Sequence, residues 1–504
     1  MTIHLSIVLW LPLAAGVLGL LAPARLARWI VLGGALAVLG YAVILIADFD
    51  DGARGLQYVT DRSWIAELGI SCKLGVDGLN LFLIALTALV FAAGILWAAL
   101  REWERPGLFF FWMAMAQSAV LGALMAQDLA LFVVFFDLML VPFLFLTLGW
   151  GGENRGPAII KLFIYTLVGS LLMLSAAIAT AVLVPGEAIT FELSALARVA
   201  PELDEGTQQW IFLFFAAAFL VKMPAFPLHG WMPDGYRAMP MPVLAVFSAV
   251  LSKVAAYGFL RIVLPLFPDA GAHFQDLLLL IALGSVLYGS AMAFTTTDAR
   301  LILGYSSIAQ LGFILLGVFA LEPEGAQGAV IQAVNHGLVV APAFFIVALL
   351  AERAGGSEDI RAMGGLALRA PVLAALFLIV ALANLAMPGS SNFVGEFLIL
   401  LGLFQTKVVI AIVAFTGVAL ASVYTLRLFI ATMHNRLPAG VLSREISVRD
   451  GLVLVPLVAV ILALALYPQI ALEKGERAVS DSVAAARAAG GAPAQAAERA
   501  GVTP

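Results

Sequence analysis

The stretch FLVKMPAFPLHGW, residues 219–231, decides the fold that we expect for this chain. It closes a long apolar run and yet holds Lys222, two prolines and His229. A lysine is costly in hydrocarbon, and a proline removes a hydrogen bond from the interior of a helix. Together they predict a membrane-spanning helix that breaks here, with protein or water around the opened backbone.

The composition also indicates a membrane protein. Of the 504 residues, 63% are hydrophobic and 12% charged, about half the charged fraction typical of soluble domains. The single cysteine, Cys72, excludes a disulfide framework within the chain and a multi-cysteine metal or iron–sulfur site. No basic tract suggests a nucleic-acid partner. The first apolar run lacks a basic leader, so we interpret it as a span rather than a cleaved signal.

Runs of about 20 apolar residues cross a bilayer as helices. We therefore expect an all-α polytopic membrane protein with about 14 transmembrane helices. The twelfth run is too long for one straight crossing and is interrupted at MPGSSNF (387–393). The tail is polar and Ala-rich, so we expect a short surface helix or a frayed end there. The predicted spans are 3–22, 28–47, 78–100, 108–126, 128–149, 158–183, 209–230, 242–265, 276–296, 300–320, 327–351, 370–404, 408–433 and 450–470.

The charges between the runs predict the orientation. Loops after odd-numbered spans are rich in arginine, whereas loops after even-numbered spans are mostly acidic. Arginine-rich loops stay in the cytoplasm, so both termini are expected on the outer face. The arginines are Arg25, Arg28, Arg101, Arg105, Arg155, Arg237, Arg300, Arg353, Arg361, Arg369, Arg436, Arg444 and Arg449, and the acids are Asp48, Asp50, Asp51, Asp61, Glu67, Glu187, Glu192, Glu202, Asp204 and Glu205.

Four ionisable residues lie inside spans rather than at their edges: Asp137, Lys222, Lys253 and Glu396. Such residues cost several kcal/mol and normally face the protein interior or a wet cavity. They are either structural ion pairs or an ion pathway, and their spread over separate spans favours the pathway. Burial disfavours the protonated form of a lysine, whereas a nearby carboxylate favours the protonated form. Moving the carboxylate would therefore switch the lysine between holding and releasing a proton.

Two interrupted helices predict an internal repeat. The breaks, at Pro224 and Pro227 and at Pro388-Gly389, are five spans apart. Interrupted helices in corresponding halves are typical of inverted-repeat transporters, although simple proline kinks are an alternative. We predict spans 1–3 in residues 1–107, a first five-helix repeat in 108–265, an inverted second repeat in 276–433, span 14 in 450–470 and a polar tail in 473–504.

Two histidines extend this set. His229 follows the first break, and His336 lies in the eleventh span. Histidine suits proton relay, although a lone membrane histidine more often serves helix packing. Polar residues that could hold a water chain are Asn335, Ser306, Ser307, Tyr165 and Tyr305. The chain has no Walker A loop, Rossmann fingerprint, HExxH motif or haem histidine pair, so we expect no cofactor and no redox chemistry in it.

Several blocks, in order, resemble the antiporter-like subunits of respiratory complex I. They include FFDLMLVPFLFLTLGW, FLVKMPAFPLHGWMPD, LSKVAAYGFLR, DARLILGYSSIAQLGF, VNHGL and GSSNFVGEFLIL. The resemblance covers roughly residues 75–435 and is strongest to the M-type (chain 4 type) subunits of NADH–quinone oxidoreductase. These belong to a superfamily with the Mrp-type sodium/proton antiporter subunits.

The resemblance implies a proton-translocating, non-redox membrane-arm subunit of a proton-pumping NADH–quinone oxidoreductase, in a bacterial inner membrane. Its partners would be neighbouring antiporter-like subunits and the lipid bilayer, with no direct NADH or quinone site. An Mrp-type cation/proton antiporter subunit is the alternative. A third interpretation is a structural subunit that has lost pumping.

By position, the family's broken-helix lysine falls on Lys222, its next-span lysine on Lys253, its span-12 glutamate on Glu396 and its span-5 glutamate on Asp137. The resemblance implies that an Asp137–Lys222 ion pair modulates proton transfer. We expect protons to enter near Lys253, to pass Lys222 and His336 through water, and to leave near Glu396.

The chain departs from the family pattern in three places. The span-5 acid is Asp137, one methylene shorter than the usual glutamate, so its reach to Lys222 is open. After WMPD the family usually has AHTEAP, whereas this chain has GYRAMP, with Tyr236 and Ala238 in place of titratable residues. Gln310 stands where a histidine is common. These changes remove titratable groups from the proton uptake route.

Overall fold

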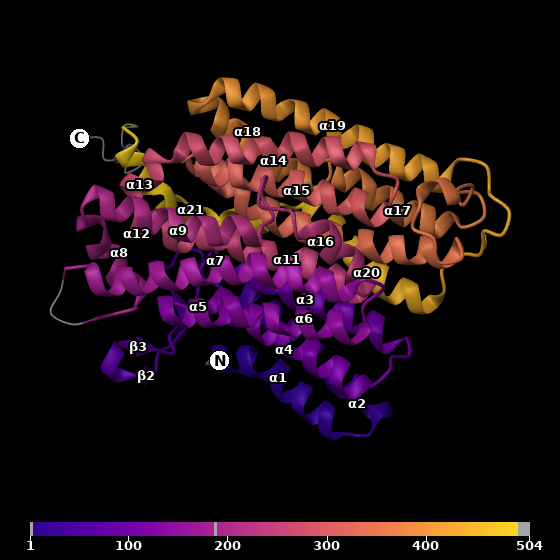
Figure 1. Ribbon diagram of the computed structural model, residues 1–504, viewed down its shortest axis with the longest axis horizontal. Coiled ribbons are helices and arrows are strands. Elements are labelled where there is room, and N and C mark those ends of the chain that lie inside the picture. The colour runs from indigo at the N-terminus through magenta and orange to yellow at the C-terminus, as the bar shows by residue number, and fades with distance from the viewer. Residues whose placement is uncertain (1–3, 186–188, 492–504) are drawn as a thin grey trace.

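The structure, a computed structural model, describes residues 4–185 and 189–491. Most helices lie side by side, with α1 and α2 at one edge of the molecule and α19 at the opposite edge (Figure 1). In the part of the chain described, eleven helices are long and apolar enough to cross a membrane, and shorter apolar helices accompany them. The protein is therefore a multi-pass membrane protein, and the total of fourteen spans stays a prediction.

The helices of the N-terminal half lead up to the first predicted break. They are α1 (Leu5–Leu21), α2 (Ala24–Asp48), α3 (Leu81–Ala99), α4 (Pro106–Met125), α5 (Leu129–Leu138), α6 (Leu140–Trp150), α7 (Arg155–Leu183), α8 (Leu193–Val199) and α9 (Glu205–Lys222). The predicted span 128–149 is thus divided at Met139, a division that the sequence-based prediction missed. Pro142 lacks the backbone N–H that a continuous helix would need there.

The remaining helices follow that break. They are α10 (Met232–Ala238), α11 (Met241–Gly258), α12 (Leu264–Leu266), α13 (Pro268–His273), α14 (Gln275–Thr295), α15 (Ala299–Phe319), α16 (Pro323–Arg353), α17 (Pro371–Asn384), α18 (Ser391–Thr406), α19 (Val408–Met433), α20 (Val448–Leu466) and α21 (Gln469–Ala489). A π-helical segment, Phe259–Val263, joins α11 to α12. Short 3-10 segments lie at Ala66–Leu68, Ala200–Glu202 and Ile360–Ala362.

The all-α prediction holds for the spans but not for the loop between α2 and α3. This loop forms two small antiparallel sheets. One pairs β1 (Gln57–Thr60) with β4 (Leu74–Val76), and the other pairs β2 (Ser63–Ile65) with β3 (Ile70–Ser71). Both lie outside the predicted spans.

Aspartates fix the starts of three helices. Asp128, Asp204 and Asp298 accept hydrogen bonds of 2.9–3.1 Å from backbone N–H groups of the first turns of α5, α9 and α15. Those N–H groups have no intrahelical partner. An aspartate cap supplies an acceptor and stabilises the helix by about 1 kcal/mol. The apolar runs therefore begin as helices at defined residues.

The charged loops lie at two ends of the helices, and the predicted orientation of the two ends stays a prediction. Arg101, Arg353 and Arg444 line one cavity at the end that we call the basic end. The opposite, acidic end holds the ion pair of Lys73 with Glu192 and that of Lys407 with Asp276. Glu187, part of the predicted acidic loop, and residues 492–504 of the predicted tail lie outside the described residues.

Both predicted breaks are confirmed. Helix α9 runs from the acidic end and stops at Lys222, and after a turn region the chain continues in α10 towards the basic end. Helix α17 starts at the basic end, and the chain resumes as α18 towards the acidic end after residues 385–390. Gly389 has φ +91 in this second break, a value that glycine adopts without strain. The two broken helices run in opposite directions, while the repeat boundaries stay predictions.

The tail differs from the prediction of a short or frayed helix. Helix α21 is 21 residues long and buries Gly475, Val479, Val483 and Ala486 against α12, α13 and α16. Lys474 donates a hydrogen bond of 2.9 Å to the backbone oxygen of Phe49. The alanines of this region are therefore a packing face, and the helix covers the acidic end.

Candidate functional site

Four of the predicted site residues lie on helices that pack one after another. Lys222 ends α9, Lys253 lies on α11, His336 on α16 and Glu396 on α18, and each of these helices packs against the next. Their side chains are between 0% and 5% exposed. We call these four residues the buried row. The packing places Lys253 between Lys222 and His336, whereas the sequence-based order of passage began at Lys253.

Lys222 binds the backbone rather than an acid. Its Nζ donates a hydrogen bond of 2.5 Å to the carbonyl oxygen of Phe136 and lies 4.0 Å from the centre of that residue's ring. Phe136 belongs to the last turn of α5, just before the division at Met139. Carbonyl groups in the last turn of a helix lack intrahelical donors. The division of the fifth span therefore provides the acceptor that holds Lys222.

Asp137 does not form the expected ion pair with Lys222. Its Oδ1 accepts a hydrogen bond of 2.5 Å from Ser170 Oγ on α7, and among the described residues no ion pair includes its carboxylate. The Asp137 side chain thus binds the neighbouring helix α7 and forms no ion pair with Lys222. Asp137 directly follows Phe136, whose carbonyl oxygen binds Lys222, so the carboxylate lies in the same region as the ammonium without pairing with it. The prediction of an Asp137–Lys222 ion pair is therefore wrong: Asp137 binds Ser170, and Lys222 binds the Phe136 carbonyl oxygen.

Lys253 also binds a carbonyl oxygen. Its Nζ donates a hydrogen bond of 2.6 Å to the Ser248 oxygen on its own helix, and the side chain is 1% exposed. Beside it lies an otherwise apolar cavity of about 10 Å³, lined by residues of α11, α15 and α16, which has room for about one water molecule. No ion pair to Lys253 occurs within residues 4–185 and 189–491.

His336 lies next to Lys253 in this row. It is 0% exposed, and neither ring nitrogen has a hydrogen-bond partner in the described part of the protein. The adjacent Gly337 explains the proximity, because a Cβ there would lie 2.6 Å from the Ala249 oxygen. Only glycine lets α16 approach α11 so closely.

Glu396 is held by two glutamines. Gln310 Nε2 donates a hydrogen bond of 2.8 Å to its Oε1, and Gln332 Nε2 donates one of 2.7 Å to Gln310 Oε1. The second oxygen, Oε2, is buried without a partner among the described residues. Sequence reasoning missed Gln332. Its spacing of four residues from His336 places both on one face of α16, which was an available signal.

His229 is set apart from the buried row. It is 8% exposed and contacts the rings of Tyr288 and Phe226, with centroid distances of 4.6 and 5.9 Å. Within the part of the chain described, no hydrogen bond or ring contact joins its side chain to the other site residues. Tyr165 lies close by, since a Cβ on Gly230 would be 2.7 Å from its hydroxyl. His229 thus borders the first break on the α7 and α14 side.

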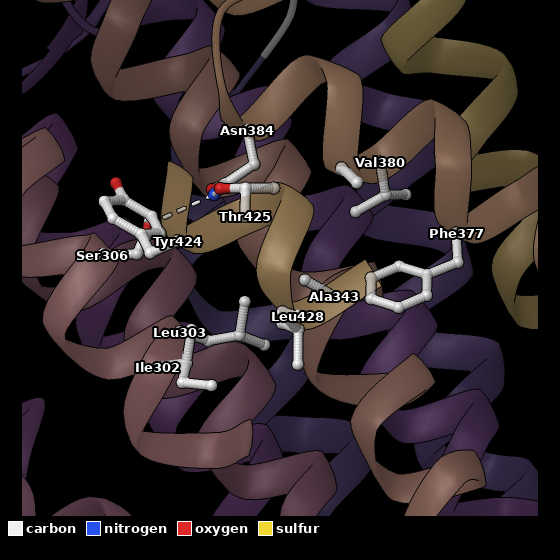
Figure 2. A pocket seen from close by; sticks show the side chains of 11 residues that line it. Ile302, Leu303, Ser306, Ala343, Phe377, Val380, Asn384, Tyr424, Thr425 and Leu428 are labelled. Atoms are coloured by element: carbon white, nitrogen blue, oxygen red, sulfur yellow. Dashed lines mark hydrogen bonds between the residues drawn. The ribbon is translucent and has the colours of Figure 1, made fainter. Parts of the chain in front are cut away.

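Ser306 belongs to a second polar group, which lies between α15, α17 and α19. Asn384, the last residue of α17, donates hydrogen bonds to Ser306 Oγ at 3.2 Å and to Thr425 Oγ1 at 3.1 Å. Ser306 Oγ also lies 3.2 Å from the Tyr424 hydroxyl. These groups line a cavity of about 10 Å³ with mostly apolar walls (Figure 2). The predicted role of Ser306 in a water chain therefore concerns the second break.

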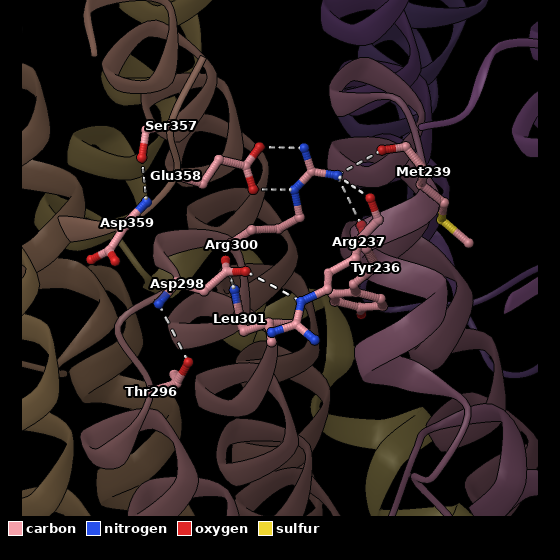
Figure 3. A network of polar contacts seen from close by, with 10 residues as sticks. All are labelled: Tyr236, Arg237, Met239, Thr296, Asp298, Arg300, Leu301, Ser357, Glu358 and Asp359. Carbon is pink, nitrogen blue, oxygen red and sulfur yellow. Dashed lines mark hydrogen bonds and ion pairs between the residues drawn. The ribbon is translucent and has the colours of Figure 1, made fainter. Parts of the chain in front are cut away.

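Arg300 clamps the segment that follows the first break. Its Nη1 donates hydrogen bonds of 2.9–3.0 Å to the backbone oxygens of Tyr236, Arg237 and Met239, at the end of α10. Its other nitrogens form a bidentate pair with Glu358 (Figure 3). One guanidinium thus ties α10, α15 and the loop after α16 together at the basic end.

The described residues contain no group of three His, Cys, Asp or Glu side chains placed to hold a metal ion. The absence of a cofactor stays a prediction. The buried row can exchange protons, because the side chain of each member is a titratable group that can gain or lose one proton.

Comparison with known proteins gives consistent matches. The family profile described as NADH:quinone oxidoreductase/Mrp antiporter, TM, matches residues 126–421. NADH-quinone oxidoreductase subunit M of Rhodobacter capsulatus is 35% identical over 92% of this chain and 93% of its own length. The subunit M of Escherichia coli (strain K12) is 36% identical, with 84% of each chain covered.

Solved structures give the same result. A chain of respiratory complex I from Thermus thermophilus with bound NADH is 31% identical, with a TM-score of 0.86 over 96% of this chain and 100% of that one. A chain of the Mrp complex from Dietzia sp. DQ12-45-1b has a TM-score of 0.83 over 96% and 98%, at 22% identity. At that identity the second likeness concerns the fold alone.

Proposed function

The chain belongs to the NADH:quinone oxidoreductase/Mrp antiporter family of membrane subunits, and from this premise we propose that it is the proton-translocating, non-redox membrane-arm subunit of a proton-pumping NADH–quinone oxidoreductase. The observation that carries the proposal is the buried row, four titratable side chains on consecutively packed helices. Buried ionisable residues at membrane depth commonly mark proton relays.

The two lysines can change charge without moving. Each donates to a neutral carbonyl oxygen, Lys222 to Phe136 and Lys253 to Ser248. An ammonium group has three donors, and the neutral amine still has N–H bonds to offer. The same hydrogen bond therefore serves both protonation states. A direct carboxylate partner would hold the charged form instead, because opposite charges stabilise each other.

His336 links the lysines to the glutamate. Neutral imidazole has one donor and one acceptor nitrogen, so it can take a proton on one side and release one on the other. The cavity beside Lys253 has room for about one water molecule, and we propose water bridges from there to the ring. Gln332, one turn away on α16, continues the polar face towards Glu396.

Glu396 is the last carrier. Gln310 orients one carboxylate oxygen, and the other oxygen is free to take the proton. Helix α18 leads from the second break to the acidic end, where Lys407 pairs with Asp276. We propose that this end faces the outside and the basic end the cytoplasm of a bacterial inner membrane, because arginine-rich loops are retained inside. The termini then face outside.

The partners that we propose are neighbouring membrane subunits and the lipid bilayer. We propose no NADH or quinone site and no cofactor in this chain, so the energy must arrive from the rest of the complex. An Mrp-type cation/proton antiporter subunit is the second candidate, and the fold alone favours it as much as it favours the first candidate. The named relatives at 35% and 36% identity favour the first.

Purification of the tagged chain in mild detergent separates the two candidates. We expect NADH-dependent quinone reduction to co-purify with it. Co-purification of a small membrane assembly without that activity, together with sodium-driven proton movement in vesicles, would contradict the proposal. The pathway is tested by Lys253→Met in the assembled complex, which we expect to lower proton translocation while quinone reduction in detergent remains.

A further inference from the structure

We propose that the basic end contains a binding site for the phosphate headgroup of an anionic phospholipid, between α3, α16 and the start of α20. The inference goes beyond the proposed function and rests on it only for the assignment of the basic end to the cytoplasmic side and for the assembled complex used in the test. It rests on a polar cavity, on three arginines without carboxylate partners, and on an exposed apolar strip of α20 beside the cavity.

The cavity lies at the basic end and is lined mainly by charged and polar residues. Its volume is about 270 Å³, more than ten times the roughly 10–15 Å³ that one water needs. Four arginines line it: Arg101, Arg353, Arg444 and Arg449. They come from loops after three different predicted spans, so only the folded chain brings them together.

The carboxylates that line the cavity are already engaged. Asp450 pairs with Arg101 at 3.0 Å and caps its own helix, whereas Glu352 lies 3.6 Å from Arg101. Glu445 accepts three backbone N–H groups, two of them at the start of α17. Asp450 and Glu352 thus pair with Arg101, and among the described residues the other three arginines form no ion pair of their own, which leaves the lining with four arginines against three carboxylates.

Arg353 is the central group of the site. It is 3% exposed, and its Nε and Nη1 donate to the backbone oxygens of Arg444 and Leu349 at 3.1 and 2.8 Å. Its third nitrogen, Nη2, has no acceptor among the described residues. Arg444 and Arg449 are exposed at the rim and form no ion pair there. A buried guanidinium with a free donor, flanked by two more, fits a phosphoryl group, which accepts such bonds strongly.

The apolar strip indicates a lipid rather than a free ion. Val448, Leu452 and Val455 of α20 are 82%, 55% and 50% exposed, and their spacing places them on one helix face. Val448 lies between two residues that line the cavity. Acyl chains along this face would place a headgroup at the arginines. Basic pockets between helices on the cytoplasmic side are typical lipid headgroup sites.

The test uses the full chain in its assembled complex, delipidated in detergent. Binding of spin-labelled phosphatidylglycerol is compared between the native protein and Arg444→Gln/Arg449→Gln, which keeps the buried Arg353. The matched control is Arg369→Gln/Arg436→Gln, which removes two exposed charges from the same end but none from the cavity. We expect the first pair to weaken binding roughly tenfold or more and the control to change it less than about twofold.

Two further arms identify the source of the phosphate. Phosphatidylcholine should compete poorly, and inorganic phosphate at millimolar concentration should leave the bound lipid in place. Equal loss of binding in both variant pairs would mean general surface charge and would overturn the proposal. Displacement by inorganic phosphate would overturn the lipid assignment, as would equal competition by phosphatidylcholine.

Discussion

The Lys222 ammonium lies 2.5 Å from the backbone oxygen of Phe136, the residue directly before Asp137, and the Asp137 carboxylate turns instead to Ser170. Lysine and acid are thus neighbours in the fold without being partners in an ion pair. The Phe136 carbonyl positions the lysine, and we propose that the negative charge of Asp137 acts on the proton affinity of Lys222 through space. This division of roles follows from the interrupted fifth span.

Replacement of Asp137 tests the through-space role. Asp137→Asn removes the charge but keeps a similar shape, and we expect about tenfold slower proton translocation, because one lost charge interaction in such a site is worth on the order of 1.4 kcal/mol. Asp137→Glu keeps the charge and should keep most of the rate. Proton uptake by reconstituted complex measures both, and equal rates in Asp137→Asn and native protein would refute the role.

The glutamine bridge at Glu396 gives a second prediction. Gln310→Leu leaves Glu396 without its donor, and hydrogen bonds to charged groups are worth about 1.5–3 kcal/mol. We expect slower translocation and a lower apparent melting temperature. Gln310→His restores a donor and should recover most of both. If the leucine variant matched the native protein in rate and melting temperature, the bridge would have no function.

The acidic end provides a prediction on pH. The hydrogen bond from the Lys73 ammonium lowers the pKa of Glu192 from its ordinary value of 4.5. A lowered carboxyl pKa stabilises the fold above that ordinary value, and the gain disappears as the pH falls through the lowered pKa. We expect Glu192→Gln to lower the melting temperature in detergent at pH 7. The loss in the free energy of unfolding should be less than about 1 kcal/mol, because the pair is partly exposed. The difference should shrink as the pH falls below 4.5, and a constant difference across this range would be inconsistent with the pair.

The Arg300 clamp gives a prediction on stability. Arg300→Ala leaves Glu358 and three carbonyl groups without a donor at a site where Arg300 is 9% exposed, and we expect a loss of about 3 kcal/mol. Arg361→Ala is the control, because its exposed pair with Asp359 is worth at most about 1 kcal/mol. Thermal unfolding compares the two, and similar losses would show that the clamp adds nothing.

Much of the fold could be predicted from hydropathy and proline position. Apolar runs in hydrocarbon must satisfy their own backbone, which fixed the spans and both breaks at Lys222 and at 387–393. The division at Met139 was missed, although Pro142 in the interior of the predicted span removes a backbone N–H and was an available signal. The small sheets after α2 could not be predicted, because their strands are only two to four residues long.

The site was predictable in its charges and not in its partners. Burial cost alone identified Lys222, Lys253 and Glu396. What each side chain binds depends on angstrom-scale packing, and the hydrogen bond of Ser170 to Asp137 could not be read from the sequence. Gln332 was missed because an amide carries no charge, although its spacing of four residues from His336 was an available signal.

The central claim is that the buried row carries protons. Its most direct test is the number of protons translocated per electron by the reconstituted complex with Lys222→Ala, against Lys407→Ala as a lysine control at the acidic end. We expect the ratio to fall in the first variant and to stay native in the second, with both complexes intact by subunit content. An unchanged ratio in intact Lys222→Ala complex would contradict the account.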